Sequence, residues 1–77
     1  MTTEEKIAIG ARIRAARIRR NFTQKQLAEK ADISVGYLGN IEHGRNMPRL
    51  RAFVRIINAL GVNPDSVLFG VPPIEDI

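Results

Sequence analysis

The chain has 77 residues, a formal net charge of +4 and no cysteine, a length that suits one domain with a single modest core. The absence of cysteine excludes disulfides and zinc sites that need sulfur, and a lone histidine excludes a cage of several imidazoles. No apolar run approaches the roughly 20 residues of a membrane span, and the N-terminal residues lack an apolar signal region. We therefore expect a soluble, cytoplasmic protein that does not associate with membranes.

The positive charge is concentrated in the first part of the chain. Eight of the twelve Lys and Arg residues lie within residues 1–30, against three acidic residues. This asymmetry suggests a partner that presents negative charge to one side of the protein, such as nucleic acid. The alternative is that the basic side chains only cover solvated helix faces. The candidates for neutralising phosphates are Arg12, Arg20, Lys25 and Arg45.

Helix caps and apolar spacing predict five short helices and no strand. The first covers about residues 3–20, with Thr3 as its N-cap and Asn21, which tolerates a left-handed conformation, after its end. In the second, Thr23 is the cap and Gln26 completes a capping box. The residues expected to face the core in these two helices are Ile9, Ile13, Ala16, Leu27, Ala28 and Ala31.

Three further helices follow at short intervals. Ser34 is expected to cap the third, over residues 34–43, which ends at Gly44. The fourth covers residues 49–60, and Asn63 caps a fifth that has Pro64 at its first position. The predicted organisation is a compact all-α domain over residues 1–70 and a tail over residues 71–77. The inward positions of these helices are expected to be Leu38, Ile41, Leu50, Phe53, Val54, Ile57, Leu60 and Leu68.

The second and third helices are the informative pair. Each opens at a hydroxyl cap, and about three residues join them, which is the geometry of a helix-turn-helix. Generic helical hairpins share this spacing, so the spacing alone leaves both readings open. The specific pattern is the run Phe22–Ser34 (FTQKQLAEKADIS), followed by Tyr37-Leu38, Ile41-Glu42-His43-Gly44, Pro48 and Leu60-Gly61-Val62.

This pattern resembles the lambda-repressor-like (Cro/XRE-type) helix-turn-helix family over about residues 7–70. The resemblance implies a five-helix DNA-binding domain with the helix-turn-helix at helices two and three, commonly in a dimeric transcriptional regulator. Two features depart from the usual pattern. Asp32 stands at a turn position that is usually Gly, and Gly36 and Gly39 lie inside the expected recognition helix, where Gly39 could permit close approach to helix two or to DNA.

The resemblance also assigns roles to individual residues. Gln24 matches a position that grips a phosphate and braces the recognition helix, while Asn40 matches a base-reading position whose amide suits adenine. Tyr37 either touches the DNA backbone or packs on the helix surface. Arg17 and Glu42 match an internal ion pair that ties helix one to helix three. The complete set of expected DNA contacts is Thr23, Gln24, Ser34, Val35, Gly36, Tyr37, Asn40, Arg45 and Asn46.

The C-terminal region has more apolar side chains than one short helix hides. With Leu68 in the core, we expect Val67, Phe69 and Val71 to form a homodimer interface, because an exposed apolar patch usually marks one. The alternative for Phe69 is to fold back onto helix one beside Ala16.

The function predicted from these observations is sequence-specific binding of double-stranded DNA by a homodimeric transcriptional regulator, repressor or controller, on a two-fold operator. The alternative is a protein-interaction module with the same fold, of the antitoxin or antirepressor type, for which residues 71–77 are the only candidate binding segment. The glycines are too scattered for a phosphate loop, and Ser34 and Ser66 are better explained as helix-start residues than as nucleophiles. We expect no enzymatic activity, cofactor, metal or small-molecule substrate.

Overall fold

The computed structural model describes residues 1–70, and the predicted tail, with Val71, lies outside the described residues. Within residues 1–70 the chain forms five helices and no strand, as predicted. The helices are α1 (Thr3–Arg19), α2 (Gln24–Ala31), α3 (Val35–Glu42), α4 (Leu50–Leu60) and α5 (Pro64–Phe69).

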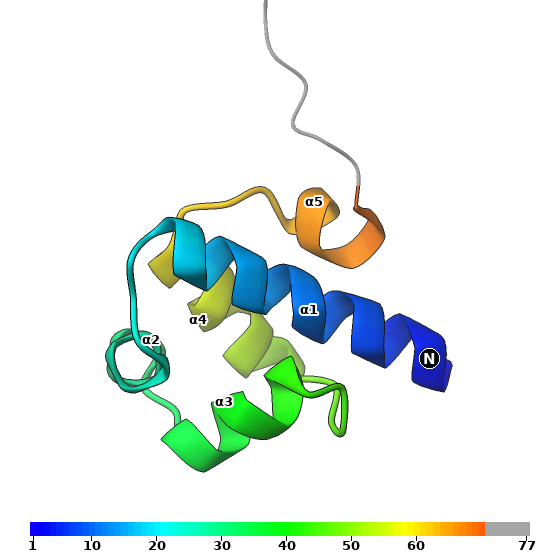
Figure 1. Cartoon of the computed structure of the whole chain (residues 1–77), viewed down its shortest axis with the longest axis horizontal. Coiled ribbons are helices and arrows are strands. Elements are labelled where there is room, and N and C mark those ends of the chain that lie inside the picture. The colour runs from blue at the N-terminus through cyan, green and yellow to red at the C-terminus, as the bar shows by residue number, and fades with distance from the viewer. Residues whose placement is uncertain (71–77) are drawn as a thin grey trace, which may run out of the picture.

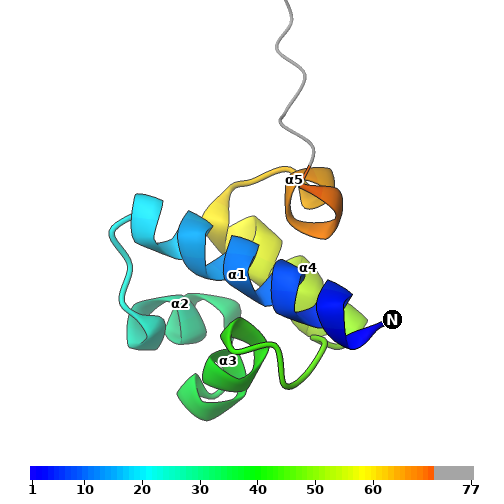
Figure 2. The same ribbon diagram turned by 45° about the vertical axis from the view of Figure 1, so that its right-hand side comes forward.

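The long helix α1 organises the domain. In Figures 1 and 2, α3 and α5 lie on opposite sides of α1, with α4 behind it. Helix α1 contacts both α3 and α5, while α2 packs against α3 and α4. This arrangement leaves α3 at the edge of the molecule, where no other helix covers its outer side.

Local hydrogen bonds explain why the helix-turn-helix begins and ends where it does. The Thr23 hydroxyl accepts the Gln26 amide at 3.1 Å, and Gln26 Oε1 accepts the Thr23 amide at 2.9 Å. Asp32 ends α2 in the left-handed conformation, with φ of 55°, which Asp adopts more readily than most residues. Ser34 Oγ then accepts the Tyr37 amide at 3.0 Å and opens α3. The expected capping box and turn are therefore confirmed.

At the start of α1 the predicted cap is wrong by one residue. The cap is Thr2, whose hydroxyl accepts the Glu5 amide at 3.1 Å while Glu5 Oε1 accepts the Thr2 amide at 2.8 Å. The cause is the residue three positions on, because a capping box needs an acceptor there. Thr2 finds Glu5, whereas Thr3 would find Lys6, which has no acceptor.

The core contains the residues expected from the first three helices, but α4 presents a different face. Leu50 and Val54 were expected inside and are 79% and 47% exposed, whereas Ala52 and Ile56 are buried. Helix α4 has two overlapping apolar stripes, and its packing against α2 selects the second. The largest fully buried side chains are Ile9, Ile13, Leu27, Leu38, Ile41, Ile56, Leu60 and Val67.

Helix α5 corrects the expected dimer interface. Val67, which was assigned to the interface, is 2% exposed and is part of the core, while Leu68 is only half-buried. A helix of six residues that lies on α1 has room for one fully inward position, and Val67 takes it. Phe69 is 67% exposed and does not fold back onto α1.

Candidate nucleic-acid interface

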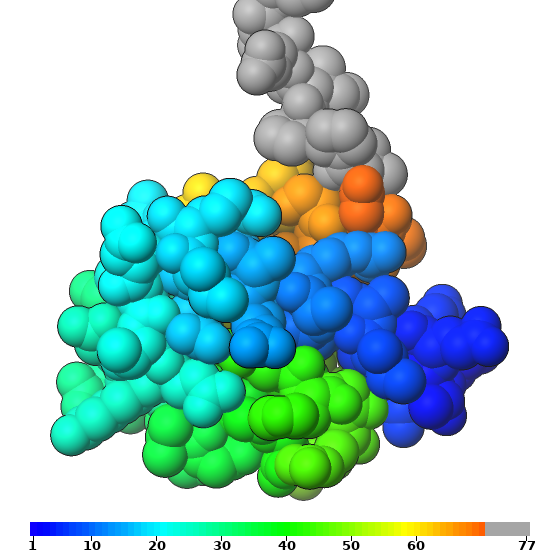
Figure 3. All heavy atoms as spheres, viewed as in Figure 1, coloured from blue at the N-terminus to red at the C-terminus, as the bar shows by residue number. Residues whose placement is uncertain are grey.

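The outer surface of α3 carries few side chains, and no other helix of residues 1–70 covers it. Val35 is 49% exposed and Gly36 is exposed, while Leu38 on the opposite side is fully buried. A Cβ atom added at Gly36 or Gly39 would meet no atom within 4 Å. The expected close approach of Gly39 to α2 is therefore wrong, and both glycines face open space. The space-filling view shows the residues of α3 on the lower surface, remote from α5 (Figure 3).

A buried carboxylate fixes the orientation of α3. Glu42, 7% exposed, receives Arg17 Nε at 2.8 Å on one oxygen and Arg17 Nη2 at 3.1 Å on the other. Gln24 Nε2 donates to the same carboxylate at 3.0 Å, and Arg17 Nη1 donates to the Phe22 carbonyl at 2.8 Å. The expected ion pair is present. It joins α1, α2 and α3 at one point, so the orientation of α3 depends on the two helices behind it.

The start of α2 adjoins this network. A hollow of about 290 Å³ is lined by Arg14, Arg17, Gln24, Glu42 and His43. One N–H of the Gln24 side-chain amide donates to Glu42, so a phosphate contact of this residue would use the second N–H of that amide or the backbone N–H at the helix start. The Thr23 and Ser34 hydroxyls accept cap hydrogen bonds and remain exposed at the starts of α2 and α3.

At the other end of α3 the predicted residues Asn40 and Arg45 lie together. Arg45 Nη1 donates to Asn40 Oδ1 at 3.2 Å, and Asn46 follows as an exposed loop residue. His43 Nδ1 lies 2.7 Å from the Gly39 carbonyl. The side chains available on the outer face of α3 are therefore Val35, Asn40 and His43.

Tyr37 is half-buried and packs against the core, in line with the packing alternative. Its hydroxyl accepts the Arg49 backbone N–H at 2.9 Å, which connects α3 to the start of α4. Tyr37 also lines a hollow of about 420 Å³ together with Arg49, Arg51, Ala52 and Arg55. The basic surface expected over residues 1–30 does not include Arg49, Arg51 and Arg55. The signal for them was the close spacing of Arg45, Arg49, Arg51 and Arg55 in the sequence.

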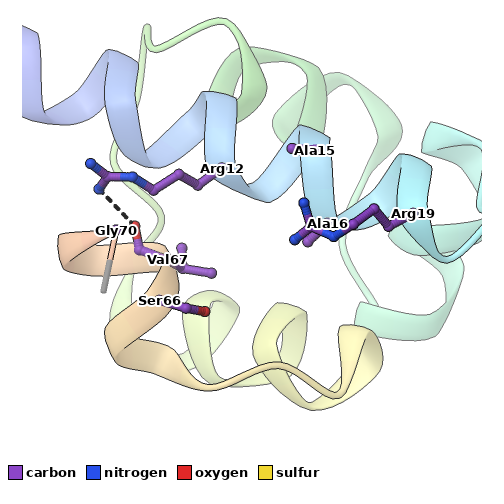
Figure 4. A pocket seen from close by; sticks show the side chains of 7 residues that line it. All are labelled: Arg12, Ala15, Ala16, Arg19, Ser66, Val67 and Gly70. Atoms are coloured by element: carbon purple, nitrogen blue, oxygen red, sulfur yellow. Dashed lines mark hydrogen bonds between the residues drawn. The ribbon is translucent and has the colours of Figure 1, made fainter. Parts of the chain in front are cut away.

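Arg12 was expected to contact a phosphate, but its side chain binds α5. Its Nη1 donates to the backbone carbonyls of Val67 and Leu68 at 3.0 and 3.1 Å. Figure 4 shows the guanidinium reaching from α1 to the end of α5, beside a hollow of about 260 Å³. Because α5 lies across α1 from α3, Arg12 stabilises the end of α5 and does not belong to the recognition surface.

Residues 1–70 contain no group of three His, Asp or Glu side chains placed to hold a metal ion. Within the same part of the chain, no helix combines the length and apolar character needed to cross a bilayer.

Two capped helices at this spacing, with the second held at the molecular edge, define a helix-turn-helix. A family model described as Helix-turn-helix matches residues 13–67. The chain belongs to this family, in its Cro/C1-type branch of DNA-binding transcriptional regulators.

Two curated proteins are similar in sequence. The immunity repressor protein of Bacillus phage phi105 is 40% identical over 62 residues, which cover 80% of this chain and 43% of the repressor. The control protein C.BamHI of Bacillus amyloliquefaciens is 32% identical over 69 residues, covering 88% of this chain and 85% of that protein. The chain thus spans less than half of the phage repressor and most of the controller.

Solved structures share the fold. The restriction-modification controller protein C.AhdI from Aeromonas hydrophila superposes with a TM-score of 0.79 at 23% identity, over 83% of this chain and 97% of that one. The clp gene regulator ClgR from Corynebacterium glutamicum gives a TM-score of 0.78 at 33% identity, over 82% and 67% of the respective chains. The likeness to C.AhdI concerns the fold, and the likeness to ClgR extends to the sequence.

Proposed function

We propose that this chain is a sequence-specific transcriptional regulator of the repressor or controller type, which acts in the cytoplasm as a homodimer on a two-fold DNA operator. The observation that carries the proposal is the Glu42 network. Contacts from α1 and α2 hold α3 by its Glu42 carboxylate while the outer face of the helix stays uncovered. A helix fixed in this way can enter the major groove as a unit. The phage immunity repressor and the control protein C.BamHI support the regulatory role.

The proposed contacts divide into two kinds. Val35, Gly36 and Asn40 face the base edges, where a Val methyl contacts thymine and an amide forms hydrogen bonds. Phosphate contacts come from the starts of α2 and α3, at Thr23, Gln24 and Ser34, and from Arg45 and Asn46 after α3. Because two glycines lie on the outer face of α3, direct contacts to bases are few and DNA shape contributes more to specificity.

The homodimer is proposed because one such domain touches too few bases for strong discrimination. The dimer interface is proposed to centre on Phe69, which is exposed on α5. Val67 is buried and is no longer part of that interface. A seam on α5 leaves α3 uncovered, since these helices lie on opposite sides of α1 (Figures 1 and 2). Two recognition helices would then contact half-sites roughly 34 Å apart, one turn of the duplex.

Selection from a randomised duplex library tests this function. Repeated binding to the immobilised protein should enrich an inverted repeat whose half-sites lie one helical turn apart. Asn40→Ala should relax the preference at one position in each half-site. Enrichment of no sequence, or of a single unrepeated site, would contradict the proposal. Asn58→Ala, a change at an exposed position of α4, is the matched control and should select the same repeat.

A further inference from the structure

The amide of Asn40 is already engaged before any DNA is bound. Arg45 Nη1 donates to Asn40 Oδ1 at 3.2 Å. Because guanidinium groups are donors only, the amide atom that faces Arg45 must be the oxygen. The orientation of the amide is therefore fixed by chemistry, with its oxygen toward Arg45 and its NH₂ group available elsewhere.

The backbone brings these two residues together independently of their side chains. Gly44 ends α3 in the left-handed conformation, with φ of 75°. Its N–H donates to the Ile41 carbonyl at 3.0 Å, and the Arg45 N–H donates back to the Asn40 carbonyl at 2.9 Å. This is the hydrogen-bond pattern of a Schellman motif. It folds the chain after α3 back over the helix end, so Arg45 returns beside Asn40.

Gly44 is held in that position by α1. A Cβ atom on Gly44 would lie 2.7 Å from the Cα of Ile7, which is too close for any side chain. The return of Arg45 is consequently determined by the packing of α3 on α1. The surroundings of the pair on the outer face of α3 are open, because Gly36 and Gly39 place no side chain there.

The pair presents a different hydrogen-bonding surface from that of a lone Asn. An unconstrained Asn amide offers one donor and one acceptor, which match N7 and N6 of adenine. Here the oxygen is turned to Arg45, and the guanidinium contributes further N–H donors and a positive charge next to the amide. A surface made mostly of donors matches guanine, whose N7 and O6 are both acceptors.

We propose that Arg45 is a specificity-determining residue that converts Asn40 from a reader of adenine into a reader of guanine. This inference rests on the proposed function, since it concerns the base that faces Asn40 in each half-site. It adds recognition of a base to the phosphate contact proposed above for Arg45, which alone would act without regard to sequence.

The test compares base preference in three variants on the selected operator. Asn40→Ala first identifies the position whose base preference depends on Asn40. At that position the unmodified protein should prefer guanine over adenine by about 10- to 100-fold in Kd. Arg45→Ala should reverse the order in favour of adenine. Arg19→Ala, at an exposed arginine in the last turn of α1, is the matched control and should keep the guanine preference.

Each alternative result has a definite meaning. A preference for adenine in the unmodified protein overturns the inference, as does an Arg45→Ala variant that weakens all operators equally and keeps guanine. An Asn40→Ala variant with unchanged base preferences overturns it as well. All three leave the proposed function intact. Enrichment of no operator at all overturns the inference and the proposed function together.

Discussion

Gly10 of α1 contacts the backbone of Ile41 in α3, so closely that a Cβ atom on Gly10 would overlap the Ile41 carbonyl oxygen. The same Cβ would lie 3.0 Å from the Glu42 carbonyl oxygen. The obstruction is backbone on both sides, so no side-chain rotation can relieve it. The crossing of α1 and α3 therefore depends on a residue without a side chain.

Gly10→Ala should lower the free energy of unfolding by about 1–3 kcal/mol, because α3 must move away from α1 to make room. Gly36→Ala is the matched control, since its Cβ meets open space. That change should raise stability by roughly 0.5–1 kcal/mol, the usual advantage of Ala over Gly in a helix. Urea unfolding of both variants measures the difference. Equal effects of the two substitutions would contradict the close crossing.

The hydrogen bonds between Arg17 and Glu42 predict that substitutions at these two residues have coupled effects on the free energy of unfolding. Glu42→Ala alone should destabilise the protein by about 3–5 kcal/mol, because it leaves the Arg17 guanidinium buried without its partner. Arg17→Ala should likewise strand Glu42. The double variant should lose less than the two single losses combined, since neighbouring residues that share hydrogen bonds do not act independently. Strict additivity in a denaturant double-mutant cycle would show that the pair does not contribute as a unit.

The helix-turn-helix was predictable from sequence because its determinants are local. Thr23, Gln26 and Ser34 form hydrogen bonds within three residues of themselves, so their spacing is sufficient to place the starts of α2 and α3. The family resemblance added the Arg17–Glu42 pair, whose members are far apart in the chain. The helix-turn-helix and the ion pair could therefore both be predicted from the sequence.

The errors arose where tertiary packing chooses between locally equivalent options. Leu50 and Val54 have the same helical spacing as the buried residues of α4, and only the position of α2 decides which stripe is inside. Val67 and Phe69 are similarly ambiguous in a helix of six residues. The contacts of Arg12 with α5 and of Gly10 with α3 join distant segments and have no local signal.

The salt dependence of DNA binding should distinguish Lys25, expected to contact a phosphate, from Arg12, which binds α5. Each phosphate contact contributes about −0.9 to the slope of log affinity against log salt. Lys25→Ala, at an exposed position of α2, should therefore make the slope shallower by about 0.9. Arg12→Ala should leave the slope unchanged, because its guanidinium is bonded to the carbonyls of Val67 and Leu68. Titration of a selected operator across a salt series measures both slopes, and a shallower slope for Arg12→Ala would refute its assignment to α5.

Phe69→Lys should convert the proposed dimer to a folded monomer with weakened operator binding, since the side chain is exposed in the single chain. Val67→Lys is the contrasting variant and should prevent folding, because Val67 is 2% exposed. Sedimentation gives the mass, and circular dichroism reports the fold. A Phe69→Lys protein that remains dimeric would place the seam elsewhere.

The start of α1 should depend on pH through Glu5. The hydrogen bonds from the Thr2 backbone and hydroxyl lower the pKa of the Glu5 carboxyl below its ordinary value. A lowered pKa stabilises the folded state above the ordinary value, and this contribution is lost as pH falls through the lowered value. The protection of the Glu5 amide, which donates to the Thr2 hydroxyl, should therefore fall in acid when its exchange rate is compared with the intrinsic rate at the same pH.

Two variants at Thr2 separate the contributions to this pKa. Thr2→Ala keeps the backbone donor and should raise the pKa of Glu5 only partly. Thr2→Pro removes both donors at a φ of −78° that proline accepts, and should raise it further. A carbon-detected NMR titration of Glu5 measures the pKa, and equal values in all three proteins would contradict the capping box.

The affinity ratio between a selected operator and a scrambled duplex of equal composition tests the central claim most directly. At physiological salt, a sequence-specific regulator should bind the operator at least about 1,000-fold more tightly. Two chains should bind each operator duplex, one to each half-site. Equal affinities for the two duplexes, with binding that depends on salt alone, would contradict the account.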